Sequence, residues 1–340
     1  MTKKQKHLIS GLVPWVLLIV AFMVLIISGE IKQVFEALRI IKPIFLVASL
    51  VLILAYWTFE ATILHLLLNR VNEKLSFKRS LMITMAGQFF NGITPFASGG
   101  QPAQLYLLHK NKVALGKGAS VLTKKFIAYQ AALVLYGLVV LIFESRFFTD
   151  QISNFIYLGA IGFLVNFLVI IGLVMMALNY KMTKKIIISM SLTLRKRFDY
   201  LKVNRKTVKI LRQVNIFHQQ MMENDQKKNV LFFSFILSLL QLTFYFSIPV
   251  MIGFGFELTF VSLYYVIGAA AFVAMVTSFV PLPGAALGAE GSFYIVFQIF
   301  FPSNIIVTTL LLWRIITFYL PIAVGGMVVL TTRKHQIIND

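Results

Sequence analysis

The chain has 340 residues, of which 59% are hydrophobic, and it carries a formal net charge of +20. Its mean hydropathy of +0.83 is typical of an integral membrane protein and excludes an ordinary soluble domain. The absence of cysteine excludes disulfides and cysteine-based metal sites, and the five histidines show no metal-binding spacing.

Apolar runs recur along the chain, each long enough to approach the roughly 20 residues that a helix needs to cross a bilayer. They occupy residues 13–29, 43–68, 119–143, 153–178, 229–253, 259–280 and 305–330. Their length, without strand-like alternation, predicts an all-α polytopic membrane protein. The first run follows a basic amino terminus, as in a signal peptide, but no small-residue cleavage pattern follows it. We therefore expect an uncleaved first span.

Residues 81–109 contain a Pro/Gly break at 94–102, Thr-Pro-Phe-Ala-Ser-Gly-Gly-Gln-Pro. The basic loops on both sides are expected in the cytoplasm, so the segment should enter and leave on one side as a re-entrant hairpin. Such irregular backbone survives at membrane depth only where protein or a wet cavity surrounds it. Polar side chains and free amides at this break are expected to hold a polar headgroup: Gln88, Asn91, Thr94, Ser98, Gly99, Gly100, Gln101 and Gln104.

A second break at 281–291 reads Pro-Leu-Pro-Gly-Ala-Ala-Leu-Gly-Ala-Glu-Gly. About 25 residues after each break, a basic residue enters an apolar run: Lys125 after the first break and Arg314 after the second. A Gly-x-Val-Val-Leu sequence begins 12 residues after each of these basic residues. Paired, Pro/Gly-broken apolar segments point to a transporter substrate site. We therefore predict two inverted-topology repeats, 1–178 and 229–340, and include Pro283 and Gly288 in the site. Two full spans within 259–302 are the alternative to a second hairpin.

Charge asymmetry predicts the orientation. With the amino terminus inside, the cytoplasmic segments hold 25 of the 32 Lys/Arg residues, and the opposite side holds four: Lys32, Arg39, Lys42 and Arg146. This positive-inside pattern predicts that both termini are cytoplasmic.

The linker between the repeats, 179–228, is the sizeable non-membrane segment and holds 13 Lys/Arg residues. Apolar residues recur at helical spacing between 200 and 222, with basic residues on the remaining face. This pattern predicts an amphipathic helix lying on an anionic lipid surface. A solvated basic linker is the alternative, whereas the segment is too short for a folded nucleic-acid-binding domain.

Charged residues inside apolar segments usually face the bundle interior or a cavity. Arg314 lies too deep to reach the interface, so we expect it to pair with Glu290 or to bind a lipid phosphate, which suits a guanidinium. Glu290 alternatively caps the following half-helix. Glu60 either reaches the nearby cytoplasmic interface or takes part in function.

No catalytic constellation is evident in the sequence. There is no Ser/His/Asp set, no paired carboxylates and no nucleotide-binding glycine loop, since Gly284–Gly288 lacks the Lys-Ser/Thr of a P-loop. We therefore expect no catalytic residues, metal or cofactor, and a driving force other than ATP.

Three stretches resemble the membrane domain of lysylphosphatidylglycerol synthase, the multiple peptide resistance factor, and the related flippase-like bacterial family. They are Gly87–Gln101, Pro281–Gly291 and Arg314–Pro321. The resemblance implies translocation of an aminoacylated phospholipid and a link to antibiotic resistance. It places the chain in the bacterial cytoplasmic membrane. Where relatives often carry a charged residue near the Gly-Gly pair, this chain has Gln101, which leaves the substrate open.

The expected function is therefore translocation of an amphipathic lipid, an aminoacyl-phosphatidylglycerol or a glycolipid, by a site that includes Arg314, Glu290, Lys125 and Glu60. The alternative is that the chain is the membrane component of a phosphatidylglycerol lysyltransferase. We expect it to be a component only, because these 340 residues leave no room for the soluble domain that makes the lipid in full-length synthases. Expected partners are the lipid substrate, anionic membrane lipids and a separate lipid-synthesising enzyme. Nucleic acid is not expected.

Overall fold

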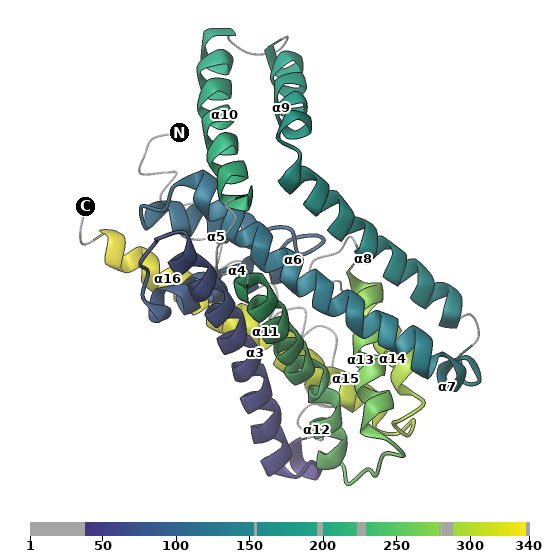
Figure 1. The fold of residues 1–340 in the computed structure, drawn as a ribbon. Coiled ribbons are helices and arrows are strands. Elements are labelled where there is room, and N and C mark those ends of the chain that lie inside the picture. Colours follow the sequence, from purple (N-terminus) through teal and green to yellow (C-terminus); the bar gives the residue numbers. More distant parts are fainter. Residues whose placement is uncertain are drawn as a thin grey trace.

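The computed structural model describes residues 38–152, 155–195, 200–222, 229–278, 280 and 288–337. The expected span at 13–29 and most of the second Pro/Gly break, including Pro283, lie outside these residues. The described part is built from helices and contains no β-strand, which confirms the all-α prediction (Figure 1).

Among the residues that the structure describes, five helical segments are long and apolar enough to cross a membrane. They are Pro43–Arg70, Leu115–Thr149, Phe155–Leu178, Asn229–Gly255 and Ile306–Thr331. Two correspond to single helices, α3 (Pro43–Arg70) and α8 (Phe155–Leu178). The others are built from α6 (Leu115–Val139), the π-helical turn η1 (Val140–Glu144), α7 (Ser145–Thr149), α11 (Asn229–Phe246), α12 (Ile248–Gly255), α15 (Ile306–Arg314), the π-helical turn η2 (Ile315–Tyr319) and α16 (Leu320–Ile337). Even the 24 residues of α8 reach about 36 Å, more than the roughly 30 Å hydrocarbon core.

Both regions with a Pro/Gly break are hairpins of shorter helices. The first pairs α4 (Phe77–Ile93) with α5 (Gly100–Lys110), and the second pairs α13 (Leu263–Thr277) with α14 (Gly288–Phe297). The longest of these helices, α4, has 17 residues and reaches about 25 Å, which is short of a bilayer core. The described helices of 259–302, α13 and α14, are therefore each shorter than a full span, as a hairpin requires. The choice between a re-entrant hairpin and two spans stays a prediction.

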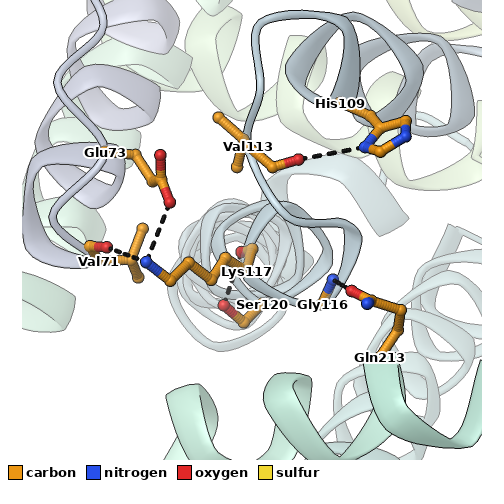
Figure 2. Close-up of polar contacts among 8 residues, drawn as sticks. All are labelled: Val71, Glu73, His109, Val113, Gly116, Lys117, Ser120 and Gln213. Atoms are coloured by element: carbon orange, nitrogen blue, oxygen red, sulfur yellow. Dashed lines mark hydrogen bonds and ion pairs between the residues drawn. The ribbon is translucent and has the colours of Figure 1, made fainter.

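The two ends of the first hairpin lie at the same end of the bundle. Figure 2 shows Lys117, just after the hairpin, donating hydrogen bonds to the carbonyl of Val71 (3.1 Å) and to Glu73 (3.0 Å), just before it. Ser76 caps the start of α4 by accepting from the amide of Arg79. The expectation that 81–109 enters and leaves on one side agrees with this geometry.

The second hairpin has its ends at the opposite end of the bundle. Tyr265 near the start of α13 and Phe300 just after α14 both stack on Phe147 of α7, with ring centroids 4.0 and 6.0 Å apart. The start of α3 lies at this end too, because the amide of Lys42 donates to the carbonyl of Gly255 (2.9 Å). Opposed hairpins are compatible with the inverted repeat, which itself stays a prediction.

The two halves interlock through close helix contacts. α16 packs along α4, where Gly92 leaves room for Ile322 and Gly325 lies against the backbone of Met85 and the side chain of Phe89. Small residues at such positions let membrane helices approach closely. This contact fixes the first hairpin against the last span.

The linker forms two helices, α9 (Tyr180–Arg195) and α10 (Tyr200–Met222), which pair and project from the bundle (Figure 1). The helix expected at 200–222 is thus present, but it packs on α9 and α6 rather than standing alone. Gln213 accepts a hydrogen bond from the amide of Gly116 (2.9 Å), and Lys124 donates to the carbonyl of Gln220 (2.8 Å). Contact of this pair with anionic lipid stays a prediction.

Candidate functional site

A cavity of about 730 Å³ lies between the two hairpins and the spans around them. Its lining combines Asn91 and Gln101 from the first hairpin with Ala274 and Ala289 from the second. The regions flanking the two Pro/Gly breaks therefore converge on one cavity, as the repeat predicted. The segment 281–287 itself lies outside the described residues.

One wall of the cavity is a buried charged network centred on Glu60 of α3. Lys125 of α6 donates to one Glu60 oxygen (2.8 Å), and Gln88 of α4 donates to the other (2.6 Å). Lys125 also donates to Gln104 of α5 (2.9 Å). Four separate helices therefore contribute to one network, and all four side chains line the cavity.

The alternative in which Glu60 reaches the cytoplasmic interface is wrong. Glu60 is 8% exposed, and its side chain and that of Lys125 are each about one-tenth exposed. A carboxylate and an ammonium group buried together compensate one another, whereas either alone would be an uncompensated charge. The network therefore gives each charged side chain a partner at the cavity wall.

The opposite part of the cavity carries the ion pair that the sequence predicted. Arg314, at the end of α15, contacts Glu290 in the first turn of α14 with 2.8 Å between Nη2 and Oε1. Arg314 is buried and lines the cavity, whereas Glu290 is one-third exposed and lies next to the lining residue Ala289. The guanidinium also lies over the ring of Phe318, 4.3 Å from its centroid. Arg314 is thus held by an acid on one side and an aromatic face on the other.

The polar residues of the first break divide between the cavity and the turn itself. Asn91 Oδ1 accepts from the amide of Gly100 (2.9 Å), and Thr94 Oγ1 accepts from the amide of Gly99 (2.8 Å). The expectation that these glycine amides are free to bind a headgroup is therefore wrong, because side chains already satisfy them. Thr94 and Gly99 do not line the cavity; Gln88, Asn91, Ser98, Gly100 and Gln101 do.

One further expected residue, Gly288, does not line the cavity. Gly288 begins α14 and packs against Val280, where a Cβ atom would overlap the valine side chain. It acts as a spacer between the hairpin arms. Pro283 lies outside the described residues.

Sequence reasoning did not single out several polar groups that line the cavity. They are Tyr56, Tyr129, Gln130, Asn166, Gln241, Tyr245 and Thr317. Gln130 donates to Asn166 (2.9 Å), and the rings of Tyr56 and Tyr245 lie 5.2 Å apart. Helical spacing could have revealed two of them, since Tyr56 and Tyr129 each lie four residues from a charged residue of the network.

Comparisons with known proteins show the family of the chain. The model of the family described as "Lysylphosphatidylglycerol synthase TM region" matches residues 12–325. A "UPF0104 membrane protein" of Archaeoglobus fulgidus is 24% identical over 291 residues, covering 83% of this chain and 84% of that protein. Another of Methanothermobacter thermautotrophicus is 28% identical over 152 residues, 42% of each chain. The chain is therefore a multi-pass membrane protein that belongs to the family of the lysylphosphatidylglycerol synthase transmembrane region.

Proposed function

We propose that the protein is a lipid translocase that passes the headgroup of an amphipathic lipid through the central cavity between the leaflets. The observation that carries the proposal is the presence of two ion pairs at the cavity, Glu60–Lys125 and Glu290–Arg314. A purely structural cavity has no need of two ion pairs, which are costly to desolvate. The family supports a lipid-related role in the membrane.

The chemistry of the two pairs suits a headgroup that carries a phosphate. Arg314 and Lys125 are the cations that would receive phosphate oxygens, and a guanidinium does so with two parallel hydrogen bonds. Glu60 and Glu290 would then receive a cationic or hydroxyl group of the same headgroup. A cavity of about 730 Å³ suits a headgroup, so the acyl chains would remain among the lipids outside. Aminoacyl-phosphatidylglycerol and glycolipids are the substrates that we put forward.

The orientation and surroundings form part of the proposal. We place the hairpin ends near Glu73 and Lys117, together with α9 and α10, on the cytoplasmic side of a bacterial cytoplasmic membrane, although the relatives above are archaeal. Basic residues of 179–228 would contact anionic lipids there. This is the arrangement that the charge asymmetry predicts.

The test begins with mass spectrometry of lipids that remain bound after gentle purification. The identified lipid, labelled in its headgroup, is then followed between leaflets of reconstituted vesicles. Lys125→Gln should lower the rate of movement at least tenfold, as expected when a charge-assisted contact worth about 1.5–3 kcal/mol is lost. Lys42→Gln, which removes an exposed cation outside the cavity, is the matched control and should keep the wild-type rate. Equal rates for both variants would show that the cavity is not the route.

A second candidate follows from the name of the family. The chain would then be the membrane component of a phosphatidylglycerol lysyltransferase. A catalytic partner that co-purifies with the chain, and lysyl transfer to phosphatidylglycerol that requires both, would favour this candidate. Lipid movement by the isolated chain would favour translocation.

A further inference from the structure

A second buried acid lies outside the central cavity and forms no ion pair with any residue that the structure describes. Glu144, the last residue of the π-helical turn η1, is 1% exposed, and its Oε2 atom has no hydrogen-bond partner among the residues that the structure describes. It lies near the Thr149 end of the span Leu115–Thr149 and does not line the cavity. A charged carboxylate without a partner is costly at such a buried position.

The surroundings of Glu144 offer it no cation. Its carboxyl group lies directly against Gly268 of α13, where a Cβ atom would overlap it, and the hydroxyl of Tyr264 on the same helix is its hydrogen-bonding neighbour. In the described part of the elements packed around η1, the other titratable groups near this end are turned to other partners or to the surface. They are Arg146 and Tyr157, both exposed, Tyr265, stacked on Phe147, and Tyr136, bonded to Thr243.

Helix α13 links Glu144 to the cavity. Gly268 contacts the carboxyl group, and Ala270, Val273, Ala274 and Thr277 of the same helix line the cavity. The π-helical turn that carries Glu144 adds a residue to the local turn of the span, a distortion that is frequent at functional sites. A change at Glu144 therefore acts on the helix that forms part of the cavity wall.

We infer that Glu144 is a proton-binding site, and that its protonation couples the packing of α13 against η1 to lipid movement. The inference rests on the proposed lipid translocation. The carboxylate takes one proton from water and becomes a neutral acid, which is compatible with the described packing. On release of the proton the carboxylate requires water, so an arrangement with α13 separated from η1 is favoured. A proton gradient then supplies the driving force.

Proton binding is tested first, without any transport assay. The purified full chain is titrated by infrared spectroscopy, which resolves the carbonyl band of a protonated carboxyl group. Glu144→Gln should remove one titrating band, and its fold is checked by thermal unfolding. Glu257→Gln is the matched control, because Lys42 lowers the pKa of the exposed Glu257, so this acid stays ionised near neutral pH. If Glu144→Gln does not fold, hydrogen exchange of α13 in the wild type replaces it, and protection should rise on protonation.

Coupling is tested in vesicles with an imposed pH difference of about one unit. This is a tenfold proton gradient, about 1.4 kcal/mol per proton. Coupling of one proton to one lipid shifts the leaflet ratio of the labelled lipid by up to tenfold in the wild type and not at all in Glu144→Gln. Glu257→Gln should behave as the wild type.

The outcomes separate this inference from the proposed function. Wild-type lipid movement that responds to the pH difference only when Glu144 is present supports the coupling. The inference is overturned by any of three results. The infrared spectra are the same with and without Glu144, the hydrogen-exchange protection of α13 does not change on protonation, or the wild type and Glu144→Gln respond equally to the pH difference. If the wild type moves no lipid at all, the proposed function and the coupling fail together, while a titrating Glu144 still establishes the proton site.

Discussion

At the scale of single residues, buried charge is the feature that most constrains this protein. Glu60, Lys125 and Arg314 are buried within the bundle, and each is held by a partner of opposite charge. A charge in a membrane interior is tolerated when it is paired or faces a wet cavity. These residues are paired, and all three line the cavity. Removing one partner is therefore more damaging than removing both.

The pair Arg314–Glu290 provides a direct test of this statement. Glu290→Leu leaves Arg314 as a buried cation and should lower the free energy of unfolding by about 3 kcal/mol, the lower end for buried pairs, since Glu290 is one-third exposed. The double variant Arg314→Leu with Glu290→Leu should recover most of this loss, measured by thermal unfolding in detergent. If Arg314 binds the lipid phosphate, the folded double variant should still lose lipid movement. Movement at the wild-type rate would refute the binding role.

His218 makes the α9–α10 pair sensitive to pH. Its side chain is buried against Tyr180 and Phe217, and this burial lowers the pKa of His218 below the ordinary value of 6.5. The unfolded segment therefore takes up a proton first as the pH falls. The stability contributed by neutral His218 is complete above about pH 6.5 and decreases below it.

Limited proteolysis at a series of pH values measures this effect. Cleavage within α9–α10 should become faster as the pH falls below about 6.5 in the wild type, and His218→Gln should remove the change. His109→Gln, at an exposed position in the last turn of α5, is the control and should keep the wild-type pH profile. An unchanged pH profile in His218→Gln would contradict the assignment.

At the scale of elements, close helix contacts decide how the pieces fit. The contact between α10 and the start of α6 depends on Gly116, since a Cβ atom there would overlap the backbone carbonyl of Gln213 and the side chain of Ile216. The hydrogen bond from Gly116 to Gln213 requires the same approach. The linker is therefore attached to the bundle by a specific contact between α10 and the start of α6, and not only by the positive charge of its Lys/Arg residues.

Gly116→Val should release the α9–α10 pair while leaving the bundle folded. Gly172→Val in α8 is the matched control, because a Cβ atom at Gly172 meets nothing within 4 Å and the gain in helix propensity is the same. Hydrogen exchange should show lower protection in α10 for Gly116→Val only. Equal protection in the two variants would mean that the contact does not hold the pair.

At the scale of the whole molecule, the two hairpins enter from opposite ends. Because the chain contains no cysteine, single cysteines report on the side of each position without a background signal. Lys78→Cys and Lys110→Cys, at the two ends of the first hairpin, should react with an impermeant thiol reagent from the same side. Asp150→Cys and Glu257→Cys should react from the other side. A first hairpin whose two ends react from opposite sides would refute the hairpin topology.

The sequence predicted the helical membrane class, five of the spans and the pairing of Arg314 with Glu290, because these follow from apolar length and from the cost of a deep charge. It also predicted the first hairpin, since the basic loops on both sides of 81–109 are expected on the same side of the membrane. It did not identify Glu144 as a buried acid, because the apolar run seemed to end one residue earlier. It also assigned free amides to Gly99 and Gly100 that Thr94 and Asn91 satisfy.

What only the tertiary structure decided is which polar groups meet. Lys125 and Glu60 are 65 residues apart in the chain, and Lys124 and Gln220 are 96 apart. Periodicity and charge counting report which face of a helix is polar, but not which helix that face meets or in what register. Those partners are chosen by side-chain packing between distant helices and by the requirement that each buried charge be compensated. The sequence therefore determined which residues have to be explained, and the packing of the helices decided their partners.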